Sequence, residues 1–289
     1  MVSVPFVTVI IPVYNNPSGV AKALDALMTQ SYPADRFEVV VGDNGSRDDT
    51  NMVVRGYAAQ YGDRVRWVIE DKVQSSYAAR NRAISIARGE ILAFTDSDCV
   101  PHPSWIEEGV AGLERQNAAC GGGRVEFTFK RDRPNASEYL DATNSLDQRR
   151  YVEQEGFAAT ANFFARRDLF RRQGLFLAEL ISGGDYEFGR RVTGAGEKLV
   201  YLEDAVVEHP ARDSFRAVLK KRRRVARGAM QLDKLGMRER SGSQWRLILP
   251  ARSWPKDKRW SSTLTLWDKM QLLILQTLAR WVSLYTWLR

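Results

Sequence analysis

Two carboxylates stand one residue apart in Asp96-Ser97-Asp98, directly after an apolar run of the chain. In a loop, both side chains can converge on one ligand. Mg²⁺ and Mn²⁺ bind carboxylate and phosphate oxygens together, and a site with one or two protein carboxylates normally needs substrate phosphates to complete the metal shell. The spacing therefore favours a diphosphate held through a divalent metal, with an ordinary solvated turn as the alternative.

Polar residues follow two more apolar runs in the same way. Tyr14 and Asn15 come after the first run, and Asp43 and Asn44 come after the second. In open α/β sheets, ligands bind beyond the carboxyl ends of the strands. Each segment alone is typical of a turn, but three such segments at one sheet edge favour a binding site.

These runs alternate with segments of helical periodicity. Strands are expected at 6–13, 37–41, 65–69 and 90–95, and helices at 19–30, 49–61 and 77–87. The first run is continuously apolar and β-branched, as expected of a strand that is buried on both faces. The alternation predicts an α/β fold with a mostly parallel central sheet flanked by helices.

The net charge of +8 is unevenly distributed. Residues 1–211 carry 24 Lys and Arg against 30 Asp and Glu, whereas residues 212–289 carry 19 against 5 and hold six of the eight tryptophans. We therefore expect a mildly acidic body at 1–211 and a basic helical tail at 212–289. The asymmetry indicates an anionic partner, and the clustering of tail aromatics with leucines favours a membrane surface over nucleic acid.

The end of the tail, 270–288, is largely apolar with one charge, Arg280. As a helix it would measure about 28 Å, just short of a comfortable membrane span. Trp267, Trp281 and Tyr285 suit the water–lipid boundary. We expect an amphipathic helix in the membrane interface, with a span or a helix packed on protein as alternatives.

Other features limit the location and the class of chemistry. The N-terminus has no signal-peptide pattern, and two cysteines fit a reducing compartment, so we expect a cytoplasmic protein at the cytoplasmic face of a membrane. The sequence contains no P-loop, no Gly-x-Gly-x-x-Gly opening the first helix and no Gly-x-Ser-x-Gly elbow. P-loop, dinucleotide and serine-hydrolase chemistry are therefore not expected.

Taken in order, the motifs of the body resemble those of the family-2 glycosyltransferases with the GT-A fold. The matching segments are Val9–Asn15, Val41–Asp48, Ala79–Asn81, Ala87–Gly89, Phe94–Asp98, Pro103–Trp105, Gly183–Arg190 and Val206–Pro210. The resemblance covers about residues 4–228. It implies an inverting, DXD-containing enzyme of polysaccharide biosynthesis that uses a nucleotide-diphosphate sugar, with a UDP-sugar favoured.

The resemblance also assigns roles to the residues at the sheet edge. The nucleotide sugar would contact residues of the first half of the body, about 1–120, namely Pro12, Tyr14, Asn15, Asp43, Asn44, Arg80 and Asp96. Asp98 would bind the metal, Mn²⁺ or Mg²⁺. His209, after the apolar run 205–207, would be a second ligand, with a buried and hydrogen-bonded histidine as the alternative.

In the same family, an Asp in the segment Gly183–Glu187 is the general base of the inverting members. Asp185 takes that place, with a helix N-cap as the alternative role. Gly184 stands where Glu is common, and Glu187 is a reserve base that would face elsewhere on a helix. The second half, about 121–211, would bind the acceptor, a glycan or a lipid-linked saccharide.

Two other classes are weighed against this interpretation. A nucleotidyltransferase that makes nucleotide sugars would need a Gly-rich basic loop after the first strand, and Pro12–Asn15 is not such a loop. A nucleic-acid-binding protein using the tail would leave the acidic residues of the sheet edge without a role.

Overall fold

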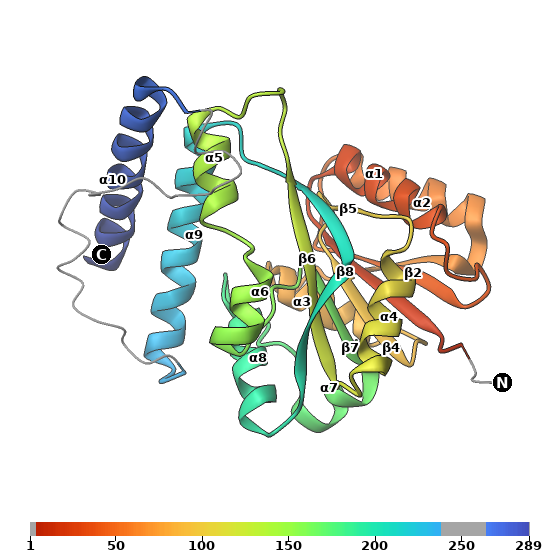
Figure 1. Cartoon of the computed structure of the whole chain (residues 1–289). Coiled ribbons are helices and arrows are strands. Elements are labelled where there is room, and N and C mark those ends of the chain that lie inside the picture. The colour runs from red at the N-terminus through yellow and green to blue at the C-terminus, as the bar shows by residue number, and fades with distance from the viewer. Residues whose placement is uncertain (1–3, 238–263, 289) are drawn as a thin grey trace. The chain divides into compact units, whose positions relative to one another are not determined.

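The computed structural model describes residues 4–237 and 264–288 of the chain (Figure 1). The chain divides into two compact units. The first comprises Met1–Glu126, Asp147–Leu180 and Gly184–His209, and the second comprises Phe127–Leu146, Ile181–Gly183 and Pro210–Arg289.

One sheet runs through the α/β body. Its strands are β1 (Val7–Val13), β2 (Phe37–Asp43), β3 (Val65–Ile69), β4 (Ile91–Thr95), β5 (Val100–Pro101), β6 (Cys120–Thr128), β7 (Asn162–Arg166) and β8 (Leu199–Pro210). Their order in the sheet is β3-β2-β1-β4-β7-β6-β8-β5. Strands β3, β2, β1 and β4 pair in parallel, and β7 joins β4 and β6 antiparallel. The predicted α/β class is confirmed, and the apolar run at 205–207 lies within the longer strand β8.

Helices flank this sheet. Those of the first unit are α1 (Pro17–Met28), α2 (Thr50–Tyr61), α3 (Ser76–Ile84), α4 (Trp105–Arg115), α6 (Gln148–Arg150), α7 (Arg167–Gln173) and α8 (Gly184–Gly194). Helix α1 begins where Pro17 fixes the first turn and the Asn16 side chain accepts a hydrogen bond from the Gly19 amide. Helix α3 crosses β2 so closely that a Cβ at Gly42 would lie 2.5 Å from the Ala79 carbonyl oxygen.

The core of the first unit lies on both faces of β1 and β2, which are buried along their whole length. A cluster of phenylalanine rings lies beside β4, in which the ring of Phe176 is 5.7 Å from that of Phe94 and 4.8 Å from that of Phe188. Stacked and edge-on rings at such distances combine burial with favourable quadrupole contacts. The cluster therefore anchors Phe176, in the segment before α8, to the core of the first unit.

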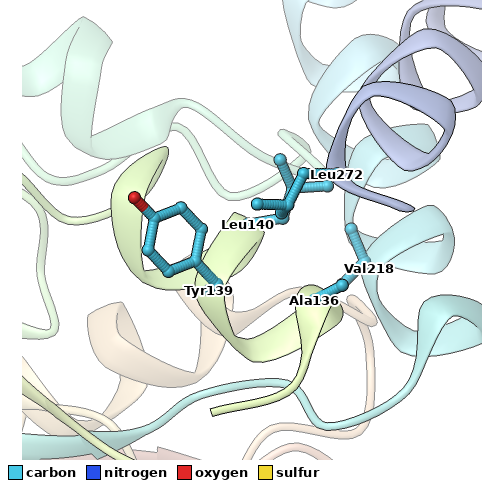
Figure 2. Packing of buried hydrophobic residues seen from close by; sticks show 5 residues of the cluster. All are labelled: Ala136, Tyr139, Leu140, Val218 and Leu272. Carbon is cyan, nitrogen blue, oxygen red and sulfur yellow. The ribbon is translucent and has the colours of Figure 1, made fainter. Parts of the chain in front are cut away.

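The second unit contains α5 (Ala136–Thr143), α9 (Phe215–Lys234) and α10 (Leu266–Leu288). Its buried cluster joins all three helices (Figure 2) and consists of Ala136, Tyr139, Leu140, Val218 and Leu272. Helix α10 thus has one face packed on protein. Among the described residues, no helix combines the length and the apolar character needed to cross a bilayer.

Candidate active site

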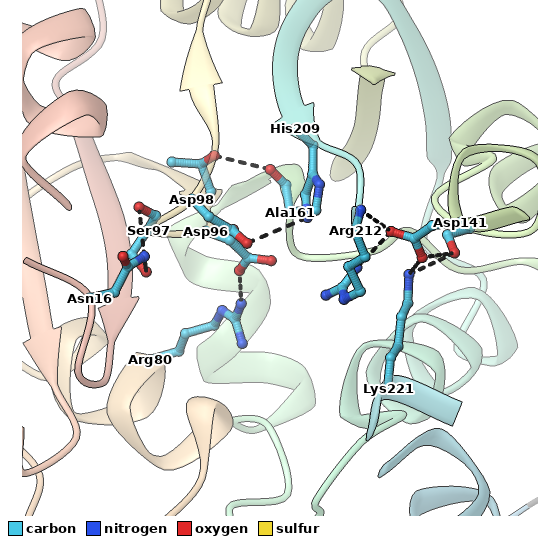
Figure 3. A network of polar contacts seen from close by, with 12 residues as sticks. Asn16, Arg80, Asp96, Ser97, Asp98, Asp141, Ala161, His209, Arg212 and Lys221 are labelled. Carbon is cyan, nitrogen blue, oxygen red and sulfur yellow. Dashed lines mark hydrogen bonds and ion pairs between the residues drawn. The ribbon is translucent and has the colours of Figure 1, made fainter. Parts of the chain in front are cut away.

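The loop after β4 carries the Asp96-Ser97-Asp98 motif in a tight turn, in which the Cys99 amide donates to the Asp96 carbonyl oxygen at 3.1 Å. The side-chain amide of Asn16 donates to Ser97 Oγ at 3.2 Å (Figure 3). The same Asn16 caps α1. The loop is therefore fixed to the start of α1, and the two aspartates keep their side chains available for other contacts.

Arg80 of α3 forms an ion pair with Asp96, with 2.5 Å between Nη2 and Oδ1. The arginine side chain is only 3% exposed, whereas the Asp96 side chain is 34% exposed. Arg80 Nε is buried and finds no hydrogen-bond acceptor within the described part of the chain. A buried guanidinium with an unused donor at the sheet edge is suited to an additional anionic ligand.

Asp98 and His209 meet at the same edge. His209 Nε2 lies 3.7 Å from Asp98 Oδ2, and the imidazole is buried at the end of β8 (Figure 3). Pairing of Val100 in β5 with Glu208 in β8 brings the two chain segments together. One imidazole nitrogen and one carboxylate oxygen suit Mn²⁺ or Mg²⁺ when phosphate and water complete the shell.

The thiol of Cys99 lies near these two groups, with candidate ligand atoms of Asp98, Cys99 and His209 all within 4.8 Å of one another. The side chain is fully buried, as expected of a packing residue. Burial raises the pKa of the Cys99 thiol well above its ordinary value, and the carboxylates of Asp96 and Asp98 add to this effect. The neutral thiol is therefore a poorer ligand than its two neighbours.

The residues after β2 are held by a network of hydrogen bonds. Asp43, the last residue of β2, accepts from the Ser46 amide at 3.0 Å and from Asn51 Nδ2 at 3.2 Å. The amide of the buried Asn44 donates to two backbone carbonyls after β3 and accepts from Gln74. Asn44 thus orders the loop, while Asp43 keeps lone pairs that can accept a further hydrogen bond.

The residues after β1 join this network. Pro12 is buried in β1 opposite Gly42, and Tyr14 is 48% exposed. Asn15 has a φ of 48°, and its Oδ1 accepts from the Arg47 amide at 2.8 Å. The predicted donor-binding segments after β1 and β2 therefore lie side by side.

Asp185 lies in the first turn of α8, one residue after the helix begins. Its Oδ1 accepts from the Tyr77 hydroxyl at 3.1 Å and from the Tyr186 amide at 3.0 Å. Glu187, in contrast, is buried in an ion pair with Arg191 at 2.7 Å and faces elsewhere, as predicted. The sequence did not predict a role for Tyr77. Its one sequence signal is its position three residues before Arg80.

The arrangement of strands and helices is shared with solved glycosyltransferases of the GT-A fold. A mannosyltransferase from Pyrobaculum calidifontis in complex with GDP-Man and Mn²⁺ superposes with a TM-score of 0.64 at 20% identity, covering 99% of this chain and 73% of that one. S. aureus TarS 1–349 in complex with UDP-GlcNAc gives 0.57 at 17% identity, covering 98% and 89%. The protein therefore has the α/β architecture of the GT-A fold.

Sequence comparison identifies the family. The model of glycosyl transferase family 2 matches residues 8–174, and the chain belongs to this family. Glycosyltransferase AglE of Haloferax volcanii is 41% identical over 239 residues, which are 82% of this chain and 78% of that protein. Validoxylamine A glucosyltransferase of Streptomyces hygroscopicus subsp. jinggangensis is 34% identical over 109 residues, 37% of this chain and 25% of that protein.

Proposed function

We propose that this glycosyltransferase moves a sugar from a nucleotide-diphosphate sugar to a hydroxyl acceptor in one step, with inversion at the anomeric carbon. The observation that carries the proposal is the meeting of Asp98 with His209 at 3.7 Å on the sheet edge that also holds the Arg80–Asp96 pair. The nucleotide sugars GDP-Man and UDP-GlcNAc in the two similar structures support the class of donor.

Asp98 and His209 would hold a divalent metal, Mn²⁺ or Mg²⁺, whose charge neutralises the diphosphate as it leaves. Asp96, held by its ion pair with Arg80, would accept a hydrogen bond from a ribose hydroxyl. Pro12, Tyr14 and Asn15 would bind the base from one side. Asp43 can accept an imide N–H of the kind that uracil offers, which favours a UDP-sugar, and Asn44 would keep the surrounding loop in place.

Asp185 would act as the general base. Two donors hold its Oδ1 and fix the plane of the carboxylate, so that the other oxygen can take the proton of the acceptor hydroxyl. The hydroxyl oxygen then bonds to the anomeric carbon while the bond to the diphosphate breaks on the opposite side, its electron pair leaving with the diphosphate. In this proposal, residues 1–211 form the catalytic part, with the acceptor bound by about 121–211.

The tail would attach the enzyme to the cytoplasmic face of a membrane as a peripheral protein. Helix α10 exposes a stripe of large apolar side chains, Trp267, Met270, Ile274, Trp281 and Tyr285. Helix α9 exposes six cations, Arg216, Lys220, Arg223, Arg224, Arg227 and Lys234. Aromatic and basic faces together suit an anionic lipid surface, and a lipid-linked saccharide or a growing glycan would be a fitting acceptor there.

A thermal-shift titration tests the donor and metal proposal. A nucleoside diphosphate at 100 times its dissociation constant should stabilise the fold by about 2.7 kcal/mol, or about 5 °C in Tm, when Mn²⁺ is present. Asp98→Asn should remove the Mn²⁺-dependent part of this stabilisation. Asp35→Asn, a change on the exposed surface, should leave it unchanged. If no nucleoside diphosphate stabilises the protein with or without Mn²⁺, the proposal fails.

A further inference from the structure

Tyr77 connects two parts of the active site that lie far apart in the sequence. It belongs to α3, its side chain is buried, and its hydroxyl donates to Asp185 Oδ1 at 3.1 Å. The two residues are 108 positions apart. Two contacts hold Tyr77 in position. Its ring packs on Phe176 with 5.9 Å between centroids. At the start of α3, Ser75 Oγ donates to the Leu180 carbonyl oxygen at 3.0 Å.

The glycine at position 184 makes room for this ring. A Cβ at Gly184 would lie 3.0 Å from three ring atoms of Tyr77, which is closer than almost all real Cβ contacts. A larger residue there would push the ring, and with it the hydroxyl, away from Asp185. Gly184 and Tyr77 therefore form a matched pair, and the glycine is the condition for the hydrogen bond.

The Tyr77 ring also contacts Arg80 of the proposed donor site. The guanidinium carbon of Arg80 lies 5.6 Å from the centroid of the Tyr77 ring, within the range of a cation–π contact. Arg80 in turn binds Asp96 at 2.5 Å. A continuous series of contacts thus runs from Asp96 through Arg80 and Tyr77 to Asp185.

We propose that Tyr77 is a positioning residue for the base: its hydroxyl orients the Asp185 carboxylate, and Gly184 is what allows the tyrosine to do so. This inference rests on the proposed role of Asp185. Titratable groups near Asp185 include Tyr186, which follows it in the chain, Arg80, which contacts the Tyr77 ring, and Cys120, which lines the same narrow cavity. Burial raises the pKa of the Cys120 thiol to about 12, so this group stays neutral.

The test is Tyr77→Phe, which keeps the ring and its packing and removes only the hydroxyl. Tyr57→Phe is the matched control, because the Tyr57 hydroxyl donates to Asp25 Oδ1 at 2.6 Å between α2 and α1. A hydrogen bond to a charged group is strong enough that Tyr77→Phe should lower kcat about tenfold with the donor KM unchanged. The split between a lower kcat and an unchanged KM separates a positioning role from a role in the scaffold. Tyr57→Phe should change neither.

Gly184→Ala provides a second, independent variant. Its methyl group should displace the ring and lower kcat to a similar extent in the wild-type background. In the Tyr77→Phe background it should add little further loss, because the hydrogen bond that it perturbs is already gone. Strictly additive losses would overturn the proposed pairing of Gly184 with Tyr77.

Two outcomes would overturn the role of Tyr77 itself. One is a Tyr77→Phe enzyme with wild-type kcat. The other is a lower kcat accompanied by a raised donor KM and an equal loss of nucleotide-dependent stabilisation, which would assign Tyr77 to the scaffold. Asp185→Asn separates this inference from the proposed function: full turnover of that variant refutes the base, whereas an inactive Asp185→Asn beside a normal Tyr77→Phe refutes only the inference.

Discussion

Asp141 is the counter-ion of two cations in the second unit, and its removal should destabilise that unit strongly. The carboxylate is 2% exposed and binds Arg212 at 2.9 Å and Lys221 at 2.8 Å (Figure 3). Burial by itself raises the pKa of Asp141, but the charges of Lys221 and Arg212 outweigh this and lower the pKa from 3.8 to about 2. By linkage, this shift corresponds to roughly 2 kcal/mol of stability at neutral pH.

Asp141→Asn should therefore cost at least that amount, and about 3–5 kcal/mol if both cations remain buried without a counter-charge. Because the folded-state pKa lies below the unfolded value, this stability is present above pH 3.8 and is lost as the pH falls toward 2. The difference between variant and wild type should therefore shrink over that range.

Urea denaturation followed by tryptophan fluorescence measures this difference. Asp213→Asn is the matched control, because the Asp213 ion pair with Lys130 at 3.1 Å has side chains 45% and 74% exposed. Such exposed pairs contribute less than about 1 kcal/mol. A loss below about 1 kcal/mol in Asp141→Asn at pH 7, or a loss that persists unchanged at pH 2.5, would refute the electrostatic reasoning.

Three further predictions concern packing, metal and membrane. Gly228→Ala should lower the Tm by several degrees, because its Cβ would lie 2.2 Å from the Ser182 carbonyl oxygen. Gly56→Ala is the control, because a Cβ at Gly56 meets open space. Equal Tm values for the two variants would contradict this reasoning. His209→Asn should raise the Mn²⁺ concentration needed for nucleotide-dependent stabilisation by at least about tenfold, because even groups that only orient metal ligands change metal affinity by about 10–100-fold. An unchanged midpoint would remove His209 from the proposed metal site. Replacing Trp267 and Trp281 by Ser should weaken sedimentation with anionic vesicles but leave turnover of a soluble acceptor unchanged, and equal sedimentation would exclude α10 as the lipid contact.

Much of the parallel part of the fold, about residues 1–120, could be predicted from the sequence because its signals are local. A continuous β-branched run such as Val7–Val13 fits only a strand covered on both faces. Asn16 and Pro17 begin α1 through a cap and a fixed φ, neither of which depends on distant residues. Once parallel strands are expected, the polar residues that follow them must share an edge, and the structure places Asn15 and Asp43 there.

The antiparallel half and the surroundings of the base could not be predicted in the same way. Strand β7 inserts between β4 and β6, and no local pattern in Asn162–Arg166 encodes that register. The contact of Tyr77 with Asp185 joins residues 108 positions apart, and it depends on a glycine whose role is visible only when the ring is in place. Likewise, the resemblance assigns Asn44 to the nucleotide sugar, and no local pattern shows that its amide also holds the loop after β3.

The charges at the sheet edge explain why an anionic donor would need a metal. Arg80, the buried cation at this edge, is matched by Asp96 at 2.5 Å, whereas Asp43 is held by uncharged donors and Asp98 lies beside a histidine. A diphosphate approaching this edge would meet uncompensated carboxylates, and two like charges 4 Å apart near a protein surface repel by about 4 kcal/mol. A divalent cation held by Asp98 would reverse the sign of that interaction and so reconcile the acidic body with an anionic donor. On this reasoning, Asp98→Asn should weaken the metal-supported binding of nucleoside diphosphate and make residual binding independent of Mn²⁺.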